Sequence, residues 1–175
     1  MNKEIRTLHA NYQHEGNKLV GYCAVWDSPA VITEGKRTFT EIVRRGPFRK
    51  AIETKGDVIA TFNHDVNRLL GRVSSGTLRL HEDDHGLRFE VDLPQHADDI
   101  KELVQRGDLK GGSFTFSVRP NGERWDGSNR ELFDLYLHEV APVVVMPAYP
   151  ATSVGVRSTT TNFYRQKLRL YERKS

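Results

Sequence analysis

The clearest local pattern in the chain is Leu78-Arg-Leu-His-Glu-Asp-Asp-His-Gly-Leu-Arg-Phe-Glu-Val-Asp-Leu93. Apolar and polar residues alternate at both ends of this stretch, which is the period of a β-strand with one buried face. Residues 81–86 between them are rich in Asp and Gly, which tolerate tight backbone geometry. The pattern predicts a β-hairpin, and it makes strand pairing the first expectation for the whole chain.

Similar apolar segments recur on both sides of this hairpin. They are rich in Val, Ile, Phe, Leu and Thr and are bounded by Gly, Asn, Asp or Pro, which indicates strands. The predicted strands cover residues 17–26, 57–64, 69–80, 86–93, 112–119 and 131–145.

Two helices are expected among the strands. The first begins at Gly46-Pro47, because proline fits the opening turn of a helix, and runs to about Lys55. The second covers 96–106 and stops at Gly107, with an apolar stripe formed by Ile100, Leu103 and Val104. Strands therefore dominate, and we expect a mainly β fold with helices, of the α+β class.

Length and charge indicate one domain with a basic extension. The chain has 175 residues and a net charge of +3, and residues 156–175 alone hold six Arg or Lys and one Glu. The rest of the chain is therefore slightly acidic, which argues against a broad face for specific nucleic-acid binding. We expect a single domain over 1–157, followed by a basic linker and a C-terminal helical tail over 158–175.

The sequence gives no sign of membrane insertion or disulfide bonding. No apolar run approaches the roughly 20 residues that span a bilayer, and the N-terminus lacks the features of a secretory signal. We therefore expect a cytoplasmic protein that does not enter membranes. The single cysteine, Cys23, lies in the apolar stretch 20–26, which predicts a buried structural thiol.

Two residues suggest acyl-transfer chemistry. Ser113 follows Gly111-Gly112 and begins an alternation that points its hydroxyl away from Phe114, while the glycines leave room for a substrate backbone. His64 ends the predicted strand 57–64. A serine hydroxyl needs a neighbouring base, so the two side chains are the minimum apparatus of a serine hydrolase. Each one alone also fits a purely structural role.

A third residue would have to orient the histidine, and His138 and Glu139 compete for that role. Strand alternation places Glu139 on the side of Leu135 and Leu137, and His138 on the other side. A carboxylate on an apolar face is costly without a partner, and His64 could supply one. The alternative is an exposed Glu139 at the frayed edge of a strand.

A zinc site is a competing interpretation of His81-Glu-Asp-Asp-His85, which has the spacing of a metalloprotease motif. That spacing brings two imidazoles together only on a helix. Here the segment is flanked by alternating strands and ends in Gly86. We therefore expect an exposed turn, and no metal or cofactor.

Six blocks of the chain, taken in order, resemble the prohead proteases of tailed bacteriophages, which share a fold with the herpesvirus assemblins. The similarity covers about residues 17–157. The matching blocks lie at 21–27, 41–48, 63–65 together with 70–72, 83–90, 107–116 and 139–150. The chain departs from the usual family pattern at Thr115, where glycine is common, and at Pro47, where alanine is common.

The resemblance implies an assemblin-like β-barrel surrounded by helices, and a serine endopeptidase without a metal or cofactor. It places the nucleophile at Ser113, the base at His64 and the acidic residue at Glu139, although assemblins have a histidine in the comparable role. It points to oxyanion donors near Ala148-Tyr149, with Pro147 excluded because proline has no backbone N–H.

The resemblance also implies a biological setting. The expected substrates are the major capsid protein with its scaffolding segment, and the protease itself, inside the assembling prohead in the host cytoplasm. The basic tail would be removed or would contact the scaffold, and self-association is left open. The alternative function is a catalytically silent scaffold or capsid-binding module.

Overall fold

The structure is a computed structural model that describes residues 2–54, 56–144 and 156–157. Two helices and a 3-10 turn accompany the strands: α1 (Arg49–Glu53), η1 (Gln95–Ala97) and α2 (Asp98–Arg106). Within these described segments, no helix combines the length and apolar character that crossing a bilayer requires. The strands are β1 (Glu4–His9), β2 (Gln13–Glu15), β3 (Lys18–Val25), β4 (Ala30–Glu34), β5 (Arg37–Val43), β6 (Ile59–Phe62), β7 (Asp65–Arg72), β8 (Leu78–Glu82), β9 (Gly86–Asp92), β10 (Gly111–Val118), β11 (Glu123–Asp126), β12 (Asn129–Leu132), β13 (Leu135–Val143) and β14 (Val156–Arg157).

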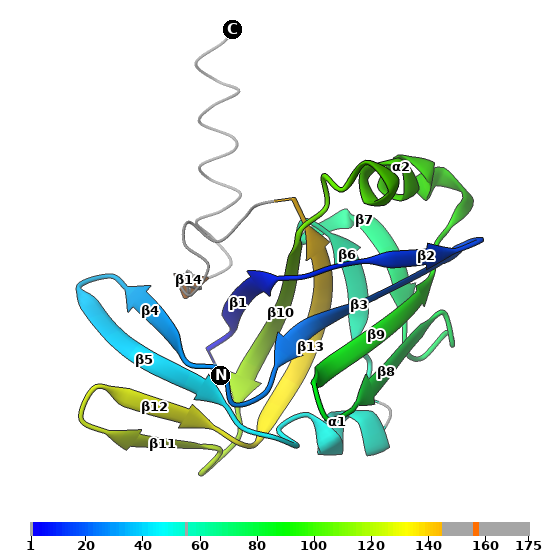
Figure 1. Cartoon of the computed structure of the whole chain (residues 1–175). Helices are drawn as coiled ribbons and strands as arrows, with labels where there is room; N and C mark the ends of the chain where they lie inside the picture. Colours follow the sequence, from blue (N-terminus) through cyan, green and yellow to red (C-terminus); the bar gives the residue numbers. More distant parts are fainter. Residues whose placement is uncertain (1, 55, 145–155, 158–175) are drawn as a thin grey trace, which may run out of the picture.

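The strands form three sheets, which confirms a mainly β fold with a few helices (Figure 1). A six-stranded sheet has the order β14-β1-β10-β13-β6-β7, and two four-stranded sheets have the orders β11-β12-β5-β4 and β2-β3-β9-β8. Each sheet is open over the residues that the structure describes, because its first and last strands are not paired with each other. The closed assemblin-like barrel therefore stays a prediction.

The predicted hairpin is confirmed as β8 and β9. Its register runs from Leu78 opposite Val91 to Glu82 opposite Leu87. The predicted helix over 96–106 is confirmed as η1 and α2, and Gly107 ends it with a left-handed φ of 72°. The first helix is also present, but it is only the short segment α1.

Two of the predicted strands are each divided in the structure. Segment 69–80 contains a turn, with Gly76 at a φ of 72°, between the end of β7 and the start of β8. Segment 131–145 changes sheet at Phe133-Asp134, because β12 pairs with β5 whereas β13 pairs with β10. Six of the described strands lie outside the predicted strand segments: β1, β2, β4, β5, β11 and β14.

The hydrophobic core lies on the Phe114 face of β10. The Phe114 ring contacts that of Phe48, just before α1, at a centroid distance of 5.4 Å, and that of Phe116 at 5.2 Å. Cys23 is fully buried in the same core, where burial raises the pKa of its thiol well above the ordinary value. This burial confirms the prediction of a structural cysteine.

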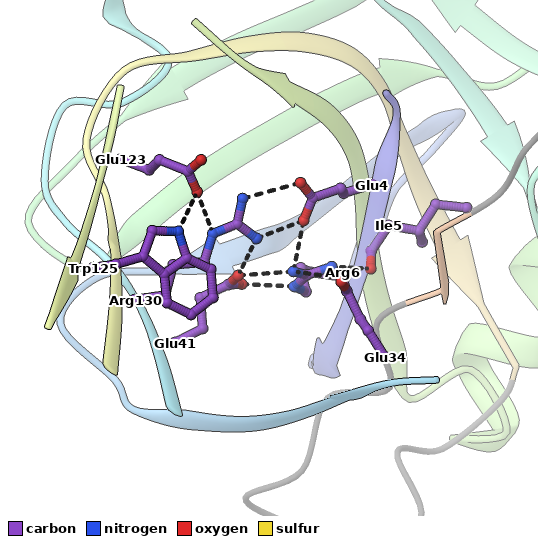
Figure 2. Close-up of polar contacts among 8 residues, drawn as sticks. All are labelled: Glu4, Ile5, Arg6, Glu34, Glu41, Glu123, Trp125 and Arg130. Atoms are coloured by element: carbon purple, nitrogen blue, oxygen red, sulfur yellow. Dashed lines mark hydrogen bonds and ion pairs between the residues drawn. The ribbon is translucent and has the colours of Figure 1, made fainter. Parts of the chain in front are cut away.

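A buried ionic cluster joins β1 to the β11-β12-β5-β4 sheet (Figure 2). Arg6 contacts Glu41 at 2.6 Å and Glu4 at 2.9 Å, and Arg130 contacts Glu4 at 2.6 Å and Glu41 at 2.9 Å. All four side chains are at least 95% buried. Since buried charges need partners, the alternation of two arginines with two carboxylates is what allows this region to be enclosed. Glu123 adds a further contact, at 2.6 Å from Arg130 Nε.

Replacing Arg130 by Ala should destabilise the fold by about 3–5 kcal/mol, because Glu4 and Glu41 would lose a buried cationic partner. The measurement is urea denaturation. Arg124→Ala is the matched control on β11, since the Arg124 side chain is 71% exposed and pairs only with Glu131 among the ion pairs of the described residues. Equal midpoints for Arg130→Ala and Arg124→Ala would contradict the structural role given to the buried cluster.

Candidate active site

His64 lies in a tight turn between β6 and β7. Phe62 pairs with Asp65, so the turn consists of Asn63 and His64, whose φ values are 55° and 59°. Positive φ at both central residues is the pattern of a type I′ hairpin turn, and Asn and His are among the residues that tolerate it best. The prediction that His64 ends a strand is therefore wrong by two residues, since β6 stops at Phe62.

Asn63 fixes this turn to the end of β13. Its backbone N–H donates to the carbonyl oxygen of Pro142 at 3.0 Å, and its side-chain Oδ1 accepts a hydrogen bond from the Val144 N–H at 2.9 Å. The two bonds hold the histidine turn against the strand that carries Glu139. Sequence reasoning missed Asn63, although its place directly before the histidine is a signal for a left-handed turn.

Ser113 lies on β10, opposite Thr7 of β1 and Ala141 of β13. Its Oγ is 2.7 Å from His64 Nε2 and 2.8 Å from the carbonyl oxygen of Arg6, and it accepts a hydrogen bond from Thr7 Oγ1 at 3.1 Å. The hydroxyl has one hydrogen, so it can serve only one of the two acceptors at a time. The residue is fully buried, with 0% exposure.

A β-bulge in β13 determines where Glu139 points. Thr115 is opposite Glu139, whereas Phe116 is opposite Leu137, so His138 is an extra residue without a partner in the register. Paired residues of antiparallel strands share a face, which places Glu139 with Thr115 and Ser113 and not with Leu137. The prediction that Glu139 lies on the leucine side is therefore wrong, because alternation assumes an unbroken strand.

The bulge also separates the two candidates for the orienting residue. His138 Nε2 lies 2.8 Å from Ser117 Oγ, while Glu139 Oε2 lies 2.9 Å from His64 Nδ1. Of the two, Glu139 is thus the one in contact with His64. The three residues singled out from the sequence, His64, Ser113 and Glu139, come together in one hydrogen-bonded chain.

The protonation of Glu139 defines the histidine tautomer. Burial alone would raise the pKa of Glu139, but hydrogen bonds from His64, Thr61 and Thr115, with the charge of His64, hold it below the ordinary value. An ionised carboxylate only accepts, so His64 Nδ1 donates to it. In the neutral ring this leaves Nε2 as the acceptor that faces Ser113.

The glycine before the serine has a structural reason. A Cβ on Gly112 would lie 2.3 Å from the carbonyl oxygen of Tyr22 and 3.0 Å from Ala10 Cβ. Its missing side chain therefore makes room for the protein's own β3 strand. The expectation that it makes room for a substrate backbone is wrong for this residue.

The segment considered for zinc is a hairpin. His81 lies in β8 and His85 in the following turn, where its ring packs edge-on against Tyr22 at 4.6 Å. The two imidazoles therefore do not have the helical arrangement that the motif requires. Over the described ranges, no group of three or more His, Cys, Asp or Glu side chains has a metal-binding arrangement.

Several expectations fall on residues that the structure does not describe. The oxyanion donors near Ala148-Tyr149 and the helical tail within 158–175 both lie outside the described residues. Conversely, the structure adds Thr7, Thr61 and Thr115 to the site. Among them, only Thr115 stood out from the sequence, as a departure from the pattern that the chain resembles.

Substituting Glu139 and Glu82 by Gln should change acid stability in opposite directions. The lowered pKa of Glu139 adds stability above the ordinary carboxyl pKa, which is lost as the pH falls through the lowered value. For Glu82, burial raises the pKa against an opposing hydrogen bond from the Phe48 N–H, so its contribution is present in acid and lost as the pH rises.

Urea denaturation between about pH 6 and pH 3 measures both effects. As the pH falls, the stability of the wild type relative to Glu139→Gln should decrease. Over the same range, the stability of the wild type relative to Glu82→Gln should increase. Slopes of the same sign would contradict the environments described for these two carboxyl groups.

Comparison with known proteins identifies the family of the chain. A family model described as caudovirus prohead serine protease matches residues 3–167. Comparison with curated proteins gave no significant match, and neither did comparison with solved structures. The match spans most of the 175 residues, and therefore the chain belongs to the caudovirus prohead serine protease family and is a serine endopeptidase of bacteriophage capsid maturation.

Proposed function

We propose that Ser113 is the nucleophile of this endopeptidase, His64 its general base and Glu139 the residue that orients the base. The observation that carries the proposal is one imidazole ring with both nitrogens engaged. Nε2 lies 2.7 Å from Ser113 Oγ, and Nδ1 lies 2.9 Å from Glu139 Oε2. Both distances are within the reach that proton transfer requires.

The reaction follows from this geometry. Ser113 Oγ attacks the carbonyl carbon of a peptide bond while His64 Nε2 takes the hydroxyl proton. The ring then gives that proton to the leaving amine, and an acyl-enzyme remains on Ser113. Water, activated by the same nitrogen, hydrolyses the ester and restores the serine. Glu139 stays ionised and stabilises the imidazolium in both steps.

The burial of Ser113 sets a condition on this reaction. The residue has 0% exposure, and the Arg6 carbonyl oxygen lies 2.8 Å from its Oγ. A substrate carbonyl therefore reaches the nucleophile only after neighbouring segments have moved. Such a requirement suits an enzyme that acts on assembled capsid or scaffold protein, the general substrate class of prohead proteases.

The finer assignments form part of the same proposal. The substrates are the major capsid protein with its scaffolding segment, and the protease itself, cleaved inside the prohead in the host cytoplasm. The assemblin-like barrel and the oxyanion donors near Ala148-Tyr149 rest on the resemblance of the motif blocks. A domain end near residue 157 is supported by β14, whose residues Val156 and Arg157 pair with β1.

Ser113→Ala should abolish cleavage of a co-expressed capsid precursor, because no other atom replaces the attacking oxygen. Ser117→Ala is the matched control, since Ser117 is buried on the same strand but contacts His138. Glu139→Gln should slow cleavage by about 100-fold or more, because the amide no longer holds the required tautomer. Gel electrophoresis and mass spectrometry of the capsid protein provide the measurement.

Processing by Ser113→Ala at the wild-type rate would refute the catalytic assignment and favour a silent scaffold-binding module. Equal loss in Ser113→Ala and Ser117→Ala, with both variants folded, would refute the specific role of Ser113.

A further inference from the structure

Glu139 occupies the middle of three adjacent strands, and each outer strand supplies one threonine. Thr115 lies directly opposite Glu139 on β10. On the other side, Glu139 is paired with Ile59 of β6, and Thr61 follows two residues later on the same face of that strand. Both threonines are enclosed, with exposures of 6% for Thr115 and 0% for Thr61.

The carboxylate of Glu139 receives three hydrogen bonds. Thr115 Oγ1 donates to Oε2 at 2.9 Å, the same oxygen that accepts from His64 Nδ1, also at 2.9 Å. Thr61 Oγ1 donates to the other oxygen, Oε1. Both oxygens of the carboxylate are thus held, and the two threonines approach it from opposite sides of β13.

A glutamate needs such restraint to act as an orienting residue. Its side chain has three torsions, and the last one, which rotates the carboxylate plane, has no sharp intrinsic minimum. A single bond to His64 would leave that plane free to turn about Oε2. Donors on both oxygens fix the plane and favour the ionised form against the cost of burial.

We propose that Thr61 and Thr115 are positioning residues that hold the Glu139 carboxylate in the rotation that faces His64. The inference rests on the proposed function, because it assigns the threonines to the His64–Glu139 contact. Among the hydrogen bonds of the described residues, those of the two threonine hydroxyls go to Glu139 and not to Ser113 or the His64 ring. Their effect on catalysis therefore passes through Glu139 alone.

Thr115→Val and Thr61→Val test the proposal, since valine keeps the β-branched shape and removes only the hydroxyl. The readout is the second-order rate constant with which a fluorophosphonate probe labels Ser113 in the full chain. Each substitution should slow labelling by about 10-fold, the effect expected for a hydrogen bond to a charged group. Thr115→Ser should restore the rate to within about twofold of wild type.

Two controls separate positioning from a general loss of structure. Thr40→Val makes the same chemical change on β5, in a different sheet, and should label at the wild-type rate. In a Glu139→Gln background, Thr115→Val should cause no further slowing, because the group that it positions has already been altered. Melting temperatures identify any variant that has lost its fold, and the Thr115→Ser variant then carries the test.

Wild-type labelling by both valine variants would overturn the inference, as would equal slowing by Thr115→Val in the wild-type and Glu139→Gln backgrounds. A folded Thr115→Ser variant as slow as Thr115→Val would also overturn it. Continued labelling of Ser113→Ala would instead refute the proposed function itself. The two failures are therefore distinguishable within one set of measurements.

Discussion

One extra residue in β13 determines how the site is assembled. Because His138 has no partner in the register with β10, the strand turns Glu139 onto the face of Ser113 and Thr115. A regular strand would place Glu139 beside Leu137, on the side where Phe116 packs into the core. The β-bulge thus converts a costly buried carboxylate into the partner of His64.

The same irregularity explains the limits of sequence reasoning. The order of the six matching blocks pointed to Ser113, His64 and Glu139. The alternation of apolar and polar residues predicted the hairpin formed by β8 and β9. The orientation of Glu139 was not predictable, since alternation carries no information about where a register shifts. His64 was misplaced for a related reason: a turn of two left-handed residues leaves the apolar pattern of 57–64 unbroken.

β1 shows a different limit. Its inward-facing side chains at Glu4 and Arg6 are charged, so a search for alternating apolar residues passes over it. These two side chains are nevertheless buried, because Arg130 and Glu41 supply opposite charges across the sheets (Figure 2). Partners that are 35 or more residues away in the chain cannot be recognised from local composition.

The placement of the Ser113 hydroxyl between two acceptors has an energetic consequence. His64 Nε2 and the Arg6 carbonyl oxygen are both within 2.8 Å of the same oxygen, so switching the hydrogen from one to the other requires no displacement of any heavy atom. Rotation about a single C–O bond is enough, and such rotations are fast compared with the opening of a strand or loop. In the proposed mechanism, reorienting the Ser113 hydroxyl toward His64 is therefore fast compared with any movement of the chain that admits a peptide.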